Sequence, residues 1–185
     1  MTKENSPRNL NNFVSLWLKI WKTNTRQMKD KKLTHVDASG NPSMVNVSEK
    51  EVTRRTAKAR AIVVLGDEII RAIQGNELMT KKGPVFQTAI LAGVMGAKKT
   101  SDLIPLCHPL GLEDCQVSIE VSETEVVITS TATLTAKTGV EMEALTAVSV
   151  AALTVYDMCK ALSHEIVIKE IKLLEKTGGK KDFRG

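Results

Sequence analysis

The stretch Ala144-Leu-Thr-Ala-Val-Ser-Val-Ala-Ala-Leu-Thr-Val-Tyr156 holds 13 residues and no charge. In helical conformation it is apolar on every side, and such a helix must be buried on every side. In a body of about 150 residues, the size of one domain, a single sheet covers only one flank of the helix. The sequence therefore predicts a second subunit on the other flank, with burial inside one chain as the alternative. Because a bilayer span needs roughly 18 to 20 apolar residues, we expect no integral membrane segment.

Charged residues return only at the two ends of this stretch, with Glu141 and Glu143 before it and Asp157 and Lys160 after it. At about 1.5 Å per residue the rise from Glu141 to Asp157 is ~24 Å, so one chain cannot close these groups into one site. Two such helices packed antiparallel would bring the glutamates of one chain to the aspartate and lysine of the other. We therefore predict that a site using both ends is shared between subunits.

The segments around this helix predict the rest of the fold. β-branched and alternating apolar residues favour strands, and a short turn between two such runs favours a hairpin. The expected elements are a strand in the second half of 54–65, helices over 67–73 (capped by Asp67) and 84–98, an irregular segment over 100–109, a hairpin over 117–134, the long helix over 139–162 and a last strand over 164–174 with a bulge near Glu170. This order predicts an α+β fold, a ferredoxin-like split βαβ sandwich with an antiparallel sheet, in an oligomer.

The charge of the chain is concentrated in its first residues. The 185 residues carry a formal net charge of +5, but residues 1–32 hold eight basic and two acidic side chains, a net of +6, which leaves −1 for residues 33–185. Both tryptophans lie before residue 33, so residues 33–185 contain only three aromatic side chains. A single-stranded nucleic-acid platform needs several exposed rings, so we expect no nucleic-acid partner. The predicted organisation is a basic extension and linker over 1–32 and one domain over 33–185.

The extension has its own pattern. Apolar residues recur at three- and four-residue spacing from Leu10 to Trp21, with lysines and asparagines opposite, which predicts a basic amphipathic helix. An organelle-targeting presequence, a peripheral membrane contact and a helix packed on the body or on another subunit are the three explanations. The three cysteines are odd in number and lack CxxC spacing, so neither a disulfide framework nor a zinc site is expected. A reducing, cytoplasmic location is the prediction, with organelle targeting as the alternative.

Two short segments carry residues suited to chemistry. Cys107 and His108 are neighbours in a proline-flanked extended loop, where adjacent side chains point to opposite faces, so we do not expect a nucleophilic pair. His108 is one of only three histidines, and a functional role competes with a hydrogen bond to the backbone. The sequence Lys81-Lys82-Gly83 precedes a predicted helix, where backbone donors and lysine favour anions such as phosphate. A solvated lysine pair is the alternative.

Asp157 and Lys160 are three residues apart, one turn along the long helix. A structural ion pair is one interpretation of this spacing. The other is an acid/base pair in a partly dry site, where loss of hydration lowers the pKa of a lysine and a nearby carboxylate opposes that fall.

Five ordered motifs together resemble one family. They are Leu33-Thr-His-Val, Ser101-Asp-Leu-Ile-Pro-Leu-Cys-His-Pro109, Lys137-Thr-Gly-Val-Glu-Met-Glu-Ala-Leu145, Val155-Tyr-Asp-Met-Cys-Lys-Ala161 and Lys176-Thr-Gly-Gly-Lys180. The chain closely resembles the cyclic pyranopterin monophosphate synthase family of molybdenum cofactor biosynthesis. The resemblance runs from Leu33 to about Phe183, nearly the whole predicted domain.

The resemblance implies a lyase that rearranges the 3′,8-cyclised dihydroguanosine triphosphate made by a radical-SAM GTP cyclase. The product is cyclic pyranopterin monophosphate, and pyrophosphate is released. It also implies a ferredoxin-like fold and a homohexamer, a trimer of dimers with active sites at subunit interfaces. No resident cofactor or protein-bound metal is implied, and Mg²⁺ accompanying the triphosphate stays an open alternative.

The resemblance also assigns residues. It implies Asp157, Lys160 and Lys82 as catalytic residues. The implied substrate-binding residues are Leu106, Cys107, His108, Met142, Glu143, Glu141 and Arg55. A triphosphate suits the cations Lys82, Arg55 and His108, and proton transfers during ring opening and closing suit Lys160 and Asp157.

The chain departs from the family in two places, and two other functions compete with the enzyme. Pro84 follows Lys82-Gly83 where the resemblance predicts an acidic residue, and residues 1–32 are additional to the family body. A non-catalytic oligomer that senses a nucleotide triphosphate would need the cations but not Asp157 and Lys160, so their presence favours the enzyme. A nucleic-acid or membrane adaptor would rest on residues 1–32 alone.

Overall fold

The computed structural model describes residues 35–37 and 39–185. The amphipathic helix predicted between Leu10 and Trp21 and the start of the Leu33 motif lie outside the described residues. The chain divides into two compact units, Met1–Ser43 and Met44–Gly185. In the first unit, the Asp37 carboxylate accepts hydrogen bonds from the backbone N–H groups of Ser39 and Asn41. The second unit contains every helix and strand described below.

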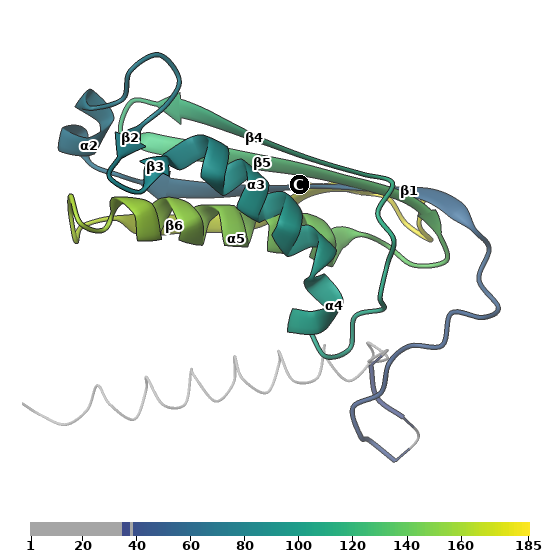
Figure 1. Ribbon diagram of the computed structural model, residues 1–185. Coiled ribbons are helices and arrows are strands. Elements are labelled where there is room, and N and C mark those ends of the chain that lie inside the picture. The colour runs from purple at the N-terminus through teal and green to yellow at the C-terminus, as the bar shows by residue number, and fades with distance from the viewer. Residues whose placement is uncertain (1–34, 38) are drawn as a thin grey trace, which may run out of the picture. The chain divides into compact units, whose positions relative to one another are not determined.

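The second unit is built on an antiparallel five-stranded sheet (Figure 1). Its strand order is β4-β5-β1-β6-β7, so the first strand of the chain lies in the middle. The strands are β1 (Thr53–Val64), β4 (Asp114–Ser122), β5 (Glu125–Ala136), β6 (Val167–Thr177) and β7 (Phe183–Arg184). A separate two-stranded hairpin pairs β2 (Met79–Thr80) with β3 (Gly83–Pro84).

Two long helices lie side by side and cover one face of the sheet (Figure 1). They are α3 (Val85–Lys98) and α5 (Glu141–Cys159), and the shorter helices are α2 (Asp67–Arg71) and α4 (Thr100–Leu103). Helix α5 packs on α3 and on strands β1, β5 and β6. Among the described helices, α5 is long and apolar enough to cross a membrane, by length and composition alone. However, 56% of its most apolar 18-residue segment is buried inside the chain, and core helices of soluble proteins share this feature.

Small side chains set the distance between α5 and the sheet. Alternate residues of β1, from Ala57 to Val63, are fully buried, because successive side chains of a strand point to opposite faces. The α5 residues Ala144 and Ala151 are fully buried as well. The hydroxyl of Ser130 in β5 donates a hydrogen bond of 2.7 Å to the carbonyl oxygen of Ala144. Larger side chains here would overpack the core, at a cost of about 1–3 kcal/mol.

The order of elements predicted from the sequence is confirmed. The 117–134 region forms the β4–β5 hairpin, and the long helix and the helix ending at Lys98 are present. The bulge predicted near Glu170 is confirmed, because the β1–β6 register shifts where Ile62 pairs with Glu170 and Val63 pairs with Ile168. The fold is α+β, with an antiparallel sheet packed against helices.

Several predicted boundaries were wrong. Strand β1 covers Thr53–Val64 rather than the second half of 54–65, because β5 and β6 hydrogen-bond to it on both sides. Asp67 is not the cap of α2, since the N-cap is Gly66 and no side chain caps the helix. The 100–109 segment begins with α4, and β6 is not the last strand, because Phe183–Arg184 pairs with it.

Candidate functional site

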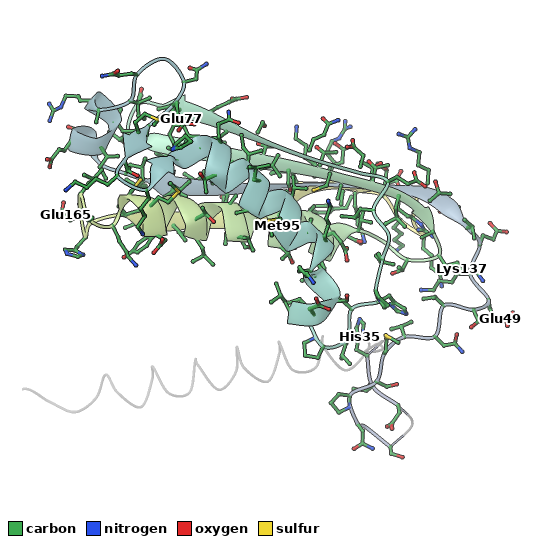
Figure 2. All side chains as sticks on the ribbon, in the orientation of Figure 1. His35, Glu49, Glu77, Met95, Lys137 and Glu165 are labelled. Atoms are coloured by element: carbon green, nitrogen blue, oxygen red, sulfur yellow. The ribbon has the colours of Figure 1, made fainter. Side chains whose placement is uncertain are left out.

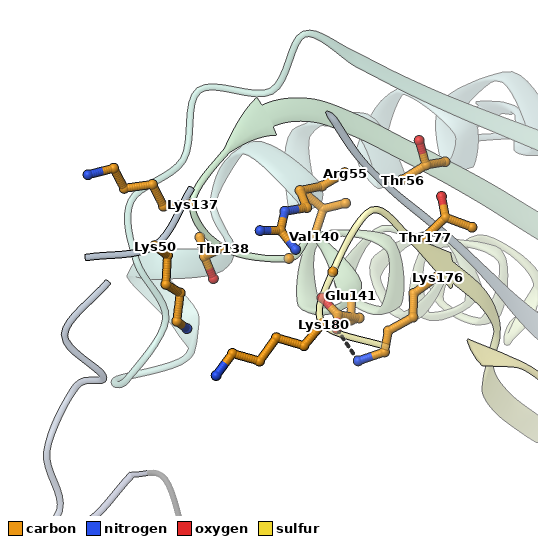
Figure 3. Close-up of a pocket in the computed structure, with 12 residues that line it drawn as sticks. Lys50, Arg55, Thr56, Lys137, Thr138, Val140, Glu141, Lys176, Thr177 and Lys180 are labelled. Atoms are coloured by element: carbon orange, nitrogen blue, oxygen red, sulfur yellow. Dashed lines mark hydrogen bonds and ion pairs between the residues drawn. The ribbon is translucent and has the colours of Figure 1, made fainter. Parts of the chain in front are cut away.

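A pocket rich in positive charge opens at the N-terminal end of α5. Its volume is about 170 Å³. The charged residues that line it are Lys50, Arg55, Lys137, Lys176, Lys180 and Glu141 (Figure 3). We call this set of residues the basic pocket. Five cations against one carboxylate favour an anionic ligand with several charges.

Three elements bring the basic pocket together. Arg55 comes from β1, Lys176 from the end of β6, and Glu141 is the first residue of α5. Lys176 pairs with Ala57 in the β1–β6 register, which places it beside Arg55. The Arg55 Nε donates a hydrogen bond of 3.3 Å to the carbonyl oxygen of Ala136, and this contact fixes the guanidinium at the pocket wall.

An ion pair inside the pocket sets the charge of Glu141. The Lys176 Nζ lies 2.9 Å from the Glu141 Oε1 (Figure 3). Burial raises the pKa of Glu141, but the hydrogen bond from Lys176 and the nearby charges of Lys176 and Arg55 outweigh burial and hold this pKa below its usual value. Glu141 is therefore ionised at neutral pH and holds the Lys176 ammonium in place.

Glu143 differs from its neighbour in both burial and charge. It is 4% exposed, and burial, with a further contribution from the charge of Glu141, raises the pKa of its carboxyl. Burial, and then the charge of Glu143, also raise the pKa of the Cys107 thiol. The raised pKa favours the thiol form of Cys107 over the thiolate.

The remaining residues of the 106–108 segment lie in the irregular chain between α4 and β4. The His108 Nε2 lies 2.9 Å from the carbonyl oxygen of Val45. This is the backbone hydrogen bond that was the alternative to a functional role, and it leaves the other ring nitrogen for a ligand. Leu106 is half-buried, and Met142 on α5 is 37% exposed.

A second cluster lies at the other end of α5. The Asp157 carboxylate holds two ammonium groups, with Lys82 Nζ 2.7 Å from Oδ2 and Lys160 Nζ 2.6 Å from Oδ1. Lys82 also donates a hydrogen bond of 3.0 Å to the Asp157 carbonyl oxygen. We call these three residues the lysine–aspartate cluster. The structure therefore brings together all three predicted catalytic residues.

The protonation states in this cluster differ from the expectation of a dry site. All three side chains are about half exposed in the single chain, so of the two interpretations of Asp157 and Lys160 the single chain shows the ion pair and not a dry site that lowers the pKa of Lys160. Hydrogen bonds from Lys160 and then Lys82 lower the pKa of Asp157 to about 2. The hydrogen bond to Asp157 and its charge raise the pKa of Lys160. Lys160 is therefore protonated in the resting state.

The basic pocket and the lysine–aspartate cluster are at opposite ends of one rigid element. Glu141 is the first residue of α5 and Asp157 lies in its last turn, a rise of ~24 Å. Of the predicted substrate-binding residues, Arg55 and Glu141 line the basic pocket, and the three predicted catalytic residues form the lysine–aspartate cluster, but the chain does not bring the pocket and the cluster to each other. This separation agrees with the spacing argument made from the sequence.

Sequence reasoning missed four cations of the basic pocket as site residues. Lys137, Lys176 and Lys180 belong to the motifs that carry the resemblance, and Lys50 had no signal at all. In the C-terminal motif, the sequence feature that could have indicated the pocket is the pair Gly178-Gly179 between Lys176-Thr177 and Lys180, because such a pair favours a turn. Gly178 has a φ of 81°, and a Cβ at this position would collide with the carbonyl oxygen of Arg54. That turn is what returns Lys180 to the pocket.

The described residues contain no group of three or more His, Cys, Asp or Glu side chains placed to hold a metal ion. A sequence profile of the MoaC family matches residues 44–179, which include the lysine–aspartate cluster and every charged residue of the basic pocket except Lys180. Because this match covers well over half of the sequence, the chain belongs to the MoaC family, the enzymes of molybdenum cofactor biosynthesis that the sequence motifs resemble.

Proposed function

We propose that this chain converts (8S)-3′,8-cyclo-7,8-dihydroguanosine 5′-triphosphate to cyclic pyranopterin monophosphate and pyrophosphate. The observation that carries the proposal is the basic pocket, in which five cations, four of them within the MoaC family region, surround a single carboxylate. A radical-SAM GTP cyclase supplies the substrate. A cytoplasmic location stays a prediction from the sequence.

The basic pocket suits the triphosphate of this substrate, which carries about four negative charges. Arg55 offers a fork of N–H donors to phosphate oxygens, and Lys176 is a point charge positioned by Glu141. A sugar hydroxyl loses its proton to solvent as its oxygen attacks the α-phosphorus. The bond between that phosphorus and the oxygen bridging to the β-phosphate breaks, and pyrophosphate leaves with this oxygen. This step needs neutralisation of the charge that grows on the leaving group. Lys176 and Lys180 are suited to supply it.

The lysine–aspartate cluster suits the rearrangement of the ring. Opening and reclosing the purine-derived ring require protons to be delivered and removed. Lys160 carries a proton in the resting state, because Asp157 stabilises its ammonium form. We assign Lys160 as the proton donor, and Lys82 as the cation that Asp157 holds beside it.

A complete site then needs two chains, the basic pocket of one and the lysine–aspartate cluster of another. The outer side of the α3–α5 layer supports such an assembly. Leu91 and Met95 on α3 and Leu153 on α5 are each more than half exposed in the single chain (Met95 is labelled in Figure 2). Exposed apolar side chains on neighbouring helices favour burial against another chain. The proposed assembly is the homohexamer of ferredoxin-like subunits implied by the resemblance, a trimer of dimers.

The test uses the full chain and the chemically defined cyclised triphosphate. Oxidation of the product to a fluorescent pterin and an enzymatic assay of pyrophosphate are run in parallel, each with Mg²⁺ and with EDTA. We expect equal amounts of pterin and pyrophosphate, and none from the Lys160→Ala variant at an unchanged oligomeric mass. Substrate binding without either product would contradict the proposal and support a nucleotide sensor.

A further inference from the structure

Glu77 makes an unusual set of contacts outside both halves of the site. Its Oε1 accepts hydrogen bonds from the backbone N–H groups of Leu78 and Phe86, each at 2.8 Å. Its Oε2 accepts one from the N–H of Gln87 at 3.1 Å. Figure 2 labels Glu77 at the end of the molecule where β2, β3 and the start of α3 lie. One carboxylate thus connects the chain before the β2–β3 hairpin to the helix that follows it.

Helix α3 has no cap of its own. Its N-cap residue is Pro84, which makes no side-chain cap hydrogen bond, and its first turn contains no acidic residue. The first N–H groups of a helix have no partner within it, and a carboxylate there also interacts favourably with the helix dipole. Glu77 supplies both the hydrogen-bond acceptors and the negative charge from outside the helix. It takes the place of the acidic residue expected at position 84.

Lys82 lies inside the loop that Glu77 closes. The Val85 N–H donates a hydrogen bond of 2.9 Å to the Leu78 carbonyl oxygen, which closes the loop a second time. The Thr80 hydroxyl accepts from the Lys82 N–H and donates to the Gly83 carbonyl oxygen, both at 3.2 Å. The turn that carries Lys82 is therefore held at its base by Glu77 and across its tip by Thr80.

The same contacts fix Lys82 relative to its partner. Glu77 is bound to the first turn of α3, and α3 packs along α5, the helix that carries Asp157. Lys82 reaches Asp157 through two hydrogen bonds from a side chain that is half exposed. A long exposed side chain gains little from an ion pair alone, so its place depends on the backbone beneath it.

We propose that Glu77 is a positioning residue for Lys82, acting by capping α3 and closing the β2–β3 hairpin. This inference rests on the proposed function for its kinetic readout. Glu77→Gln replaces one acceptor oxygen with an N–H₂ donor that faces a backbone N–H, so at least one of the three contacts is lost. The turn that carries Lys82 is then held less firmly, while the charge of the Lys82 side chain is retained.

The test compares the full-length wild type, Glu77→Gln, Lys82→Ala and the double variant. Glu68→Gln, at an exposed position of α2, is the matched control. We expect kcat of Glu77→Gln to fall between about tenfold and about a hundredfold, because small displacements of a catalytic group have effects of that size. We expect KM to change less than threefold. In the Lys82→Ala background, Glu77→Gln should have no further effect on kcat. Glu77→Asp keeps the carboxylate and should recover part of the loss.

A second readout does not depend on activity. Amide hydrogen exchange at Phe86 and Gln87 should accelerate in Glu77→Gln, and acylation of Lys82 by an amine-reactive ester should become faster while that of Lys98 is unchanged. Unchanged kcat and Lys82 labelling in Glu77→Gln, or equal effects of that change with and without Lys82, would overturn the inference. If the wild type forms no product, the proposed function fails, and the labelling still decides whether Glu77 positions Lys82.

Discussion

The Nζ of Lys82 lies 2.7 Å from the Oδ2 of Asp157, although 75 residues separate the two in the sequence. The other oxygen of the same carboxylate holds Lys160 at 2.6 Å. One exposed carboxylate therefore keeps two ammonium groups close together, and its charge offsets the repulsion between them.

Replacing Asp157 with Asn should change stability in a pH-dependent way. The pKa of Asp157 is about 2 in the folded chain against 3.8 for an unperturbed aspartate. A depressed pKa contributes stability that is present above the unfolded value and is lost as the pH falls through the folded one. The melting temperature of Asp157→Asn should thus lie below that of the wild type at pH 6, by a small amount because the group is exposed. The two should converge near pH 2, whereas a constant difference would contradict the pKa.

The stability of Glu143→Gln should depend on pH in the opposite direction to that of Asp157→Asn. Burial raises the pKa of Glu143, so the folded chain favours the neutral carboxyl. Such a group contributes stability below its unfolded pKa, and this contribution is lost as the pH rises through the folded value. The melting temperature of Glu143→Gln relative to the wild type should therefore be higher at pH 8 than at pH 4. The exposed Glu120→Gln serves as the control and should show no such trend.

Lys176→Met should weaken binding of the triphosphate. The change removes the ammonium that Glu141 positions in the basic pocket, and a charged hydrogen bond of this kind is worth about 1.5–3 kcal/mol. KM should rise about tenfold or more, and the effect of added salt on KM should decrease. Lys172→Met, on the same strand but outside the pocket, should leave KM within about twofold. Equal effects of the two changes would show that only overall charge matters.

Gly178→Ala should destabilise the chain. Gly178 has a φ of 81°, and a Cβ there would collide with the carbonyl oxygen of Arg54. The backbone strain alone costs about 1–3 kcal/mol. Gly111 has open space around it and no positive φ, so Gly111→Ala is the matched control. Thermal unfolding of both variants checks the prediction, and equal melting temperatures would contradict it.

Local patterns in the sequence were sufficient for much of the fold. Alternation in β4 and β5 predicted the hairpin, and the uncharged run predicted α5 and the separation of its two ends. The first half of β1 was missed because it alternates basic residues with alanine and threonine. Its strand conformation comes from neighbours that are distant in sequence, Ala136 on one side and Thr177 on the other.

The candidate site was predicted unevenly for the same reason. Asp157 and Lys160 are one helical turn apart, so their contact follows from local geometry. The contact of Lys82 with Asp157 depends on how the β2–β3 hairpin is fixed to α3, and no local pattern encodes that. The basic pocket depends on the β1–β6 register. Two bulges shift this register, and the sequence predicted only one of them.

Mixing two inactive chains is the measurement that tests the shared site most directly. One chain carries Lys160→Ala, and the other carries both Arg55→Ala and Lys176→Ala, so each lacks one half of the proposed site. In a mixed dimer one site contains both defects and the other contains neither. After co-refolding at equal amounts, we expect about a quarter of the activity of wild-type protein refolded in the same way, because half of the dimers are mixed. No activity in the mixture, beside full recovery of the refolded wild type, would contradict a site built from two chains.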